Sequence, residues 1–191
     1  NPLQEKYTNG QSVTLTATPD AGQSFIGWFG ATNSTSNIVT LVMTTNKTII
    51  AQSGLPLAES LDLTNRVLNG GDIAWYGQSA DTHDGVDAAR SGRMTNSQTS
   101  WFQITNTMSA EGTVHFWWKV SSQENYDYLK TLINGVQKPG QISGIPDWQL
   151  RTYYLTSGVQ VVRMEFTKSS NDGQASDGIT LNSDAYGTVF F

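Results

Sequence analysis

The sequence contains no cysteine, which excludes disulfide bonds, thiolate metal sites and a cysteine nucleophile. Charged residues make up only 14% of the 191 residues, and the formal net charge is −5. A protein that binds a nucleic-acid backbone needs a basic stripe, so this balance argues against such a partner. No apolar run approaches 18 residues, so we expect no membrane-spanning helix. A signal peptide is also missing, and we therefore expect a mature or excised segment.

Amphipathic runs with a helical period of 3.6 residues are nearly absent as well. Instead, short stretches alternate between apolar and polar residues, with Gly, Ser, Asn and Pro between them. Alternation with a period of two is typical of half-buried strands. The sequence therefore predicts an all-β protein. We expect a small four-stranded β domain at residues 1–53, a short linker, and an antiparallel β-sandwich of the jelly-roll type at residues 57–191.

The first 53 residues contain four short predicted strands, at 11–18, 24–29, 38–43 and 47–52. A family resemblance rests on Gly10, residues 13–22 (VTLTATPDAG), Phe25, residues 27–28 (GW) and residues 47–51 (KTIIA). At these positions the segment resembles the divergent internalin-type B repeat of bacterial surface and secreted proteins. The resemblance implies a spacer or adhesive module rather than a catalyst, and it places Trp28 in the core.

Residues 112–135 are the most informative stretch of the second domain. Val114, Phe116, Trp118 and Val120 share one face of a predicted strand, whereas the other face carries His115, Trp117 and Lys119. A second predicted strand, residues 126–133, directs Tyr128 and Lys130 outward. These neighbouring strands would expose aromatic and basic groups on one side of the domain. Such a surface is typical of a ligand platform rather than of a neutral sheet exterior.

Several motifs give the second domain a family resemblance of its own. They are residues 71–72 (GD), Trp75, residues 82–92 (THDGVDAARSG), 100–101 (SW), 116–122 (FWWKVSS), 126–129 (YDYL), 147–148 (DW) and 167–168 (TK). With these motifs the chain resembles jelly-roll modules that are appended to bacterial secreted hydrolases and peptidases. These modules are similar to laminin-G-like, MAM-like and carbohydrate-binding sandwiches. The resemblance implies a module that binds glycan or serves as a structural appendage. Residues 183–187 (SDAYG) lack the acidic pair that it would place before the last strand.

No arrangement of residues supports catalysis. His83, Asp84 and Asp87 lie near Ser79 and Ser91 in the sequence, but no strand–turn–helix elbow presents a nucleophile. Asp127 and Glu165 are a possible carboxylate pair, but a glycosidase needs two acids that flank a cleft, and Asp127 is more typical of a turn. We therefore expect a non-catalytic appendage, whose parent protein is a secreted hydrolase or lyase.

Two acidic loops could hold a structural Ca²⁺ ion, which prefers oxygen ligands. Neither loop has the spacing of an EF-hand, and Asp and Asn in loops ordinarily cap turns. Both interpretations stay open from the sequence. The candidate metal ligands are Asp81, Asp84, Asp87, Asp172 and Asp177.

Carbohydrate recognition uses aromatic rings that stack on pyranose faces, with Arg and Lys for anionic groups. We expect Trp101, Trp118 and Trp148 to lie in the core. Trp117 points outward by its position in the alternation, and the pair Trp75–Tyr76 lies in a predicted Gly-flanked rim loop. The candidate ligand-binding residues are Trp117, Lys119, His115, Trp75, Tyr76, Tyr128, Lys130, Arg90 and Arg163.

These features predict a secreted, monomeric bacterial module that binds a polysaccharide without catalysis. Its covalent neighbour in the parent protein would be a catalytic domain, and the basic candidates favour an anionic glycan. One alternative is a structural or adhesive spacer with no glycan ligand, and another is a peptidase appendage that binds protein substrate. A glycan binder should expose a strip with at least two aromatic side chains, whereas a spacer should bury its tryptophans.

Overall fold

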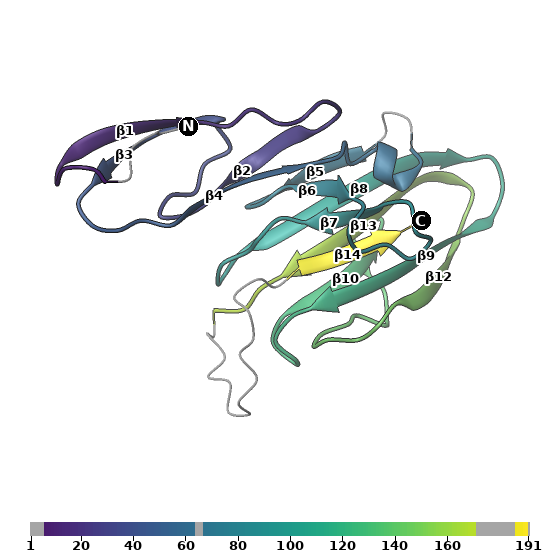
Figure 1. Cartoon of the computed structure of the whole chain (residues 1–191). Coiled ribbons are helices and arrows are strands. Elements are labelled where there is room, and N and C mark those ends of the chain that lie inside the picture. Colours follow the sequence, from purple (N-terminus) through teal and green to yellow (C-terminus); the bar gives the residue numbers. More distant parts are fainter. Residues whose placement is uncertain (1–5, 64–66, 171–185, 191) are drawn as a thin grey trace. The chain divides into compact units, whose positions relative to one another are not determined.

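The structure is a computed structural model, and it describes residues 6–63, 67–170 and 186–190. The chain divides into two compact units, Asn1–Pro56 and Leu57–Phe191. Apart from one short 3₁₀ helix, η1 (Glu59–Leu61), every element in the described ranges is a β-strand (Figure 1). The all-β prediction is therefore confirmed. None of the described helical residues forms a segment long and apolar enough to cross a membrane.

The N-terminal unit consists of two small antiparallel sheets. One pairs β1 (Gln11–Thr16) with β3 (Ile38–Met43), and the other pairs β2 (Ser24–Gly30) with β4 (Ile49–Gly54). The core prediction for Trp28 is confirmed, because this side chain is buried and contacts Phe25 edge to face at 5.6 Å. Val13, Ala17 and Phe29 are also buried in this unit.

The C-terminal unit is a sandwich of two five-stranded sheets. The sheet that we call the β8 sheet has the order β11 (Val136–Gln137), β10 (Tyr128–Ile133), β13 (Gly158–Thr167), β8 (Thr99–Met108) and β5 (Val67–Gly71). The sheet that we call the β9 sheet has the order β12 (Gln149–Leu155), β9 (Gly112–Ser121), β14 (Tyr186–Phe190), β7 (Ala88–Ser91) and β6 (Trp75–Gln78). All of the pairings are antiparallel.

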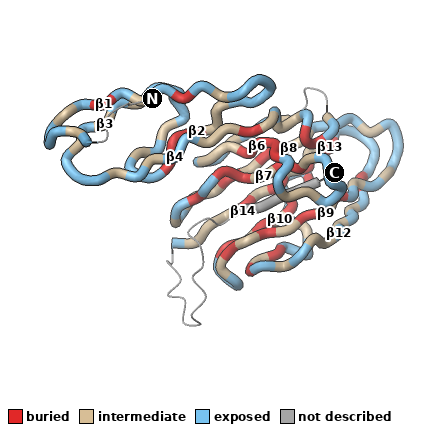
Figure 2. The backbone as a smooth tube through the Cα atoms, in the orientation of Figure 1, coloured by how far each residue is buried: buried red, intermediate tan, exposed pale blue. Residues whose placement is uncertain are grey.

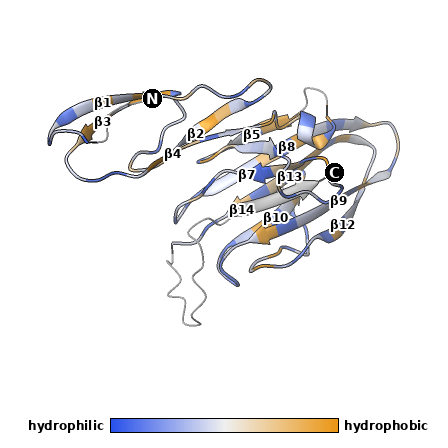
Figure 3. Ribbon diagram, in the orientation of Figure 1, coloured by the Kyte–Doolittle hydropathy of each residue, from blue (hydrophilic) through white to orange (hydrophobic). Residues whose placement is uncertain are grey.

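The core of the sandwich lies between the inner faces of these sheets. Buried and partly exposed residues alternate along β9, β10 and β13, as expected for strands that have one face in the core (Figure 2). Figure 3 shows hydrophobic and hydrophilic residues interspersed along the strands, and in β13 Val162, Met164 and Phe166 alternate with Arg163 and Glu165. The fully buried side chains include Phe116 and Trp118 from the β9 sheet and Phe102, Met164 and Phe166 from the β8 sheet.

Consecutive strands cross from one sheet to the other at residues 122–127. Ser122 donates a hydrogen bond from Oγ to the carbonyl oxygen of Asp127 at 3.1 Å. The buried Asp127 carboxylate accepts the backbone N–H groups of Gln123 and Ser169, at 3.3 and 2.8 Å. β9 and β10 belong to opposite sheets, so the prediction that they expose their aromatic and basic groups on one side is wrong.

The pair Trp75–Tyr76 forms part of β6 rather than a rim loop. Trp75 is 1% exposed, and its ring meets Phe102 edge to face at 5.0 Å. Asn69 on β5 holds the Trp75 backbone, because it donates to the carbonyl oxygen at 2.6 Å and accepts from the N–H at 2.9 Å. Tyr76 is buried as well. The prediction of exposed rim aromatics is therefore wrong for both residues.

Candidate functional site

The outer face of the β9 sheet carries the outward residues that were predicted for β9. His115 is exposed, and Trp117 and Lys119 are partly exposed, while their neighbours Phe116 and Trp118 are buried. β12 pairs with β9 so that Leu150 lies opposite Trp117 and Thr152 lies opposite His115. Residues paired across an antiparallel ladder share one face, so β12 adds its own outward side chains to this surface.

Trp148 lies on the same outer face, although the sequence suggested that it is a core residue. Gln149 pairs with the buried Trp118, so the residue before it falls opposite Lys119 on the outward side. Trp148 is partly exposed, and the Lys119 ammonium lies 5.2 Å from its ring centroid. The core prediction for Trp148 is wrong because only the register with β9 reveals which way the side chain points.

The loop of residues 79–87 lies against these tryptophans. His83 stacks on Trp117, with the ring centroids 4.1 Å apart and an interplanar angle of 15°. The same imidazole meets Trp148 edge to face at 5.7 Å. We call His83, Trp117 and Trp148 the aromatic cluster. Sequence patterns give no signal for it, because the loop and the strands lie far apart along the chain.

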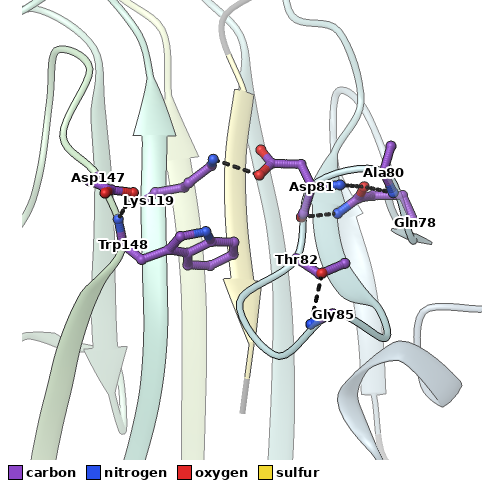
Figure 4. Close-up of polar contacts among 8 residues, drawn as sticks. All are labelled: Gln78, Ala80, Asp81, Thr82, Gly85, Lys119, Asp147 and Trp148. Atoms are coloured by element: carbon purple, nitrogen blue, oxygen red, sulfur yellow. Dashed lines mark hydrogen bonds and ion pairs between the residues drawn. The ribbon is translucent and has the colours of Figure 1, made fainter.

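An ion pair fixes the loop beside the aromatic cluster. The Nζ atom of Lys119 lies 2.6 Å from Oδ1 of Asp81, and the two side chains are 21% and 26% exposed. Figure 4 shows the indole of Trp148 and the ammonium of Lys119 both directed toward the loop that carries Asp81. The surface therefore combines indole rings with one neutralised pair of charges.

Hydrogen bonds within the loop hold its shape. At its base, the Gln78 side chain accepts from the N–H groups of Ala80 and Asp81, each at 2.8 Å, and donates to the Asp81 carbonyl oxygen at 2.7 Å (Figure 4). Nearer the tip, Thr82 accepts the N–H of Gly85 at 3.1 Å. These contacts within the loop position Asp81 and His83.

Arg90 belongs to the outer face of the β9 sheet, on β7. It pairs with Tyr76 on one side and with Thr188 on the other, and Thr188 pairs in turn with Lys119. Arg90 is partly exposed, whereas Tyr76 is buried and offers little surface to a ligand. Of the nine predicted ligand-binding residues, the structure thus brings Trp117, Lys119, His115 and Arg90 to this face in exposed or partly exposed positions.

The remaining basic candidates lie on the outer face of the other sheet. Lys130 forms an ion pair with Glu165 at 3.0 Å, and Arg163 lies 3.7 Å from the same carboxylate. Tyr128, which precedes Lys130 on β10, pairs with Thr167 of β13 in the β8 sheet. The sandwich core separates these residues from the aromatic cluster, so the predicted set is divided between two surfaces.

Trp101 is likewise on the outer face of the β8 sheet rather than in the core. The Arg163 guanidinium lies 3.9 Å from its ring centroid and donates to Gln103 through Nε and Nη2. On the neighbouring strand, a Cβ atom at Gly70 would come within 2.4 Å of the indole, so only glycine leaves room for the ring. The core prediction for Trp101 is wrong, but Arg163 and Gly70 cover much of its surface.

The predicted calcium ligands of the first acidic loop do not converge. Asp81 is paired with Lys119, and Asp84 accepts the N–H of Val86 at 2.9 Å in a turn. Burial raises the pKa of Asp87, and the nearby carboxylates of Asp62, Asp84 and Glu59 raise it further. Within the described ranges, no three His, Cys, Asp or Glu side chains are placed to hold a metal ion. Asp172 and Asp177 lie outside the described residues.

Comparison with known proteins finds a family model that matches the N-terminal unit. Residues 3–52 match the model of the divergent InlB B-repeat domain, which confirms the resemblance predicted for this segment. No curated protein matches the sequence.

Solved structures resemble the chain at low sequence identity. The secreted serine protease VesC from Vibrio cholerae has a TM-score of 0.48 and 12% identity, over 95% of this chain and 44% of VesC. TmCBM61 in complex with β-1,4-galactotriose has a TM-score of 0.43 and 11% identity, over 70% of this chain and 90% of TmCBM61. The K1 cleaved adhesin domain of Lys-gingipain from Porphyromonas gingivalis W83 has a TM-score of 0.36 and 14% identity, over 64% of this chain and 94% of that domain. The chain thus spans less than half the length of VesC.

Proposed function

We propose that the protein is a non-catalytic polysaccharide-binding module whose ligand contacts the outer face of the β9 sheet. The observation that carries this proposal is the aromatic cluster, in which Trp117 and Trp148 are partly exposed side by side on one surface. Indole rings offer a large, rigid apolar area that suits the apolar face of a pyranose. Lys119 and Asp81, which border the cluster, can exchange hydrogen bonds with sugar hydroxyl groups.

The positions of Asp127 and Glu165, the possible carboxylate pair for glycoside hydrolysis, support a non-catalytic role. Asp127 is fully buried, its two carboxylate oxygens each accept a backbone N–H group, and Oδ2 lies 3.5 Å from Nζ of Lys168. Glu165 is held between Lys130 and Arg163 on the outer face of the β8 sheet. A glycosidase needs two carboxyl groups on either side of a scissile bond, and these two are engaged in structural contacts.

The contrast between a glycan binder and a spacer also favours binding. Beside the aromatic cluster, Leu150 and Tyr154 on β12 are 46% and 59% exposed. A spacer gains nothing from such a row, because exposed apolar surface in one place favours non-specific association. In a secreted parent protein, a module of this kind would hold a linked catalytic domain near its polysaccharide substrate. An adhesive module of a surface protein is the alternative role for the same face.

Affinity electrophoresis across a panel of neutral and anionic polysaccharides tests the proposal. We expect one class of glycan to retard the wild-type chain, and Trp117→Ala and Trp148→Ala each to abolish the retardation. Trp101→Ala is the matched control, because it removes a partly exposed indole from the opposite sheet. Equal retardation of all three variants would contradict the proposed site, and no retardation of the wild type would favour the adhesive spacer.

We retain the calcium prediction for Asp172 and Asp177, and a melting experiment tests it. If a structural ion is bound there, a chelator should lower the melting temperature of the protein and added Ca²⁺ should restore it. A melting temperature that is the same with and without chelator would rule out a stabilising calcium ion. Running the panel with and without chelator then shows whether glycan binding itself depends on the metal.

A further inference from the structure

The outward side chains of β12 extend the aromatic cluster along the strand. Leu150 and Tyr154 are large, exposed and separated by Thr152, and all three point away from the core. The alternate residue Tyr153 packs against the core instead. A strand rises about 3.4 Å per residue, so Trp148 and Tyr154 lie about 20 Å apart along this line.

β9 doubles the width of this line of residues. Trp117 lies opposite Leu150, His115 opposite Thr152, and Thr113 opposite Tyr154. His115 and Thr113 are exposed, and both offer hydrogen-bonding atoms to a ligand. We call this two-stranded surface, from Trp148 to Tyr154, the β9–β12 strip. Both strands are regular over the paired residues, and the strip joins the aromatic cluster without a break.

Tyr154 forms a second aromatic platform at the far end of the strip. Its hydroxyl group donates a hydrogen bond to Oε2 of Glu111, which lies just before β9. That bond restrains the phenol ring while leaving most of it exposed. An aromatic ring with restrained torsions loses little conformational entropy when a ligand packs on it.

The charged groups along the strip favour an uncharged ligand. Lys119 is neutralised by Asp81 at the cluster end, where Asp147 also lies, and Glu111 is at the Tyr154 end. Arg151 is on the opposite side of β12, where its guanidinium lies over Trp118 and donates to the Gly140 carbonyl oxygen. An anionic polymer would meet carboxylates at both ends of the strip, so the expectation of an anionic glycan loses its support.

We infer, on the basis of the function proposed above, that the ligand is a neutral polysaccharide bound in extended form along the β9–β12 strip. The polysaccharide contacts the aromatic cluster at one end of the strip and Tyr154 at the other. Several consecutive sugar rings are engaged, because the two aromatic platforms are separated by the length of the strand. Hydroxyl groups between the platforms meet His115, Thr152 and Thr113.

Isothermal titration calorimetry with neutral oligosaccharides tests this inference on the full chain. The probes are cello-, manno-, xylo- and galacto-oligosaccharides, from disaccharide to hexasaccharide, with oligogalacturonates as the anionic set. We expect affinity for one neutral series to rise with chain length until the strip is filled. We also expect little change between low and high salt, because a neutral ligand makes no ionic contact that salt would screen.

Tyr154→Ala separates the strip from the aromatic cluster alone. It should weaken binding of the longest oligosaccharide about three- to tenfold, as expected for the loss of one aromatic contact, and leave the disaccharide unaffected. Tyr126→Ala is the control, because Tyr126 is an exposed tyrosine in the connection between β9 and β10 and is not one of the residues of the strip.

The possible outcomes distinguish this inference from the proposed function. Affinity for a disaccharide equal to that for a hexasaccharide, or Tyr154→Ala with wild-type affinity at every length, would overturn the extended mode while leaving polysaccharide binding intact. Preference for oligogalacturonates would overturn the neutral class. Failure of the wild type to bind any polysaccharide would overturn both the inference and the function on which it rests.

Discussion

The imidazole of His83 lies parallel to the indole of Trp117, with 4.1 Å between the ring centroids. A stacked ring occupies a face of the indole that a pyranose could otherwise use. A glycan bound at the proposed site would therefore compete with the loop of residues 79–87 for the same aromatic surface. The outcome of this competition depends on how firmly the loop is held in place.

Replacing His83 by alanine should strengthen glycan binding, because it uncovers a face of Trp117 while the Lys119–Asp81 pair still anchors the loop. We expect a small loss of stability, about 0.5–1.5 kcal/mol, which is typical of one aromatic pair. Titration calorimetry and urea denaturation measure the two effects. Val86→Ala, an exposed residue of the same loop, serves as the control. Weaker binding by His83→Ala would instead show that the imidazole is part of the contact surface.

The Lys119–Asp81 pair should contribute modestly to stability and lose strength in salt. The two groups are partly exposed, so we expect a coupling free energy of about 0.2–1 kcal/mol in a double-mutant cycle of Lys119→Met and Asp81→Asn. Raising the ionic strength should reduce this coupling, because mobile ions screen partly exposed charges. Urea denaturation of the four proteins at low and high salt measures it. A coupling that does not change with salt would contradict this prediction.

The faces of the long strands could be predicted from the sequence. The alternation in residues 112–121 correctly placed Phe116 and Trp118 inward and Trp117 and Lys119 outward, because each residue in a strand reverses the direction of the last. Such local periodicity needs no knowledge of the partner strand. It holds for β10 and β13 as well.

The sheet to which each strand belongs could not be predicted in this way. Periodicity identifies two faces of a strand but not its neighbours, so Tyr128 and Lys130 were grouped with Trp117 although β10 lies in the other sheet. The core prediction for Trp148 fails for the same reason, because the sequence alone does not show which side of its strand faces the core. Its direction follows only from the pairing of β12 with β9.

Asn69 should be important for stability because it links the edge strands of the two sheets. Its side-chain amide satisfies both the N–H and the carbonyl oxygen of Trp75. Asn69→Ala leaves these backbone groups without their partner, and we expect a cost of about 1–3 kcal/mol in the free energy of unfolding. Thr107→Ala, an exposed residue of β8, should cost far less. If Asn69→Ala and Thr107→Ala lower the melting temperature equally, water replaces the Asn69 amide at the Trp75 backbone.

Asp87 should make the stability of the protein depend on pH. Burial and the carboxylates of Asp62, Asp84 and Glu59 raise its pKa above 3.8, so the folded state holds this proton more tightly than the unfolded chain does. A raised pKa means that stability is fully present below the unfolded pKa and is lost as the pH rises through the folded pKa. At neutral pH the ionised carboxylate is therefore destabilising.

Replacing Asp87 by asparagine removes this repulsion, so the variant should melt at a higher temperature than the wild type at neutral pH. Its advantage should shrink as the pH falls and should vanish below about pH 3.8, where the wild-type carboxyl group is protonated in both states. Differential scanning calorimetry across this range measures the difference, with Glu124→Gln as a control at an exposed site. An advantage that persists undiminished in acid would mean that asparagine stabilises the loop by a contact of its own, because repulsion between carboxylates disappears once they are protonated.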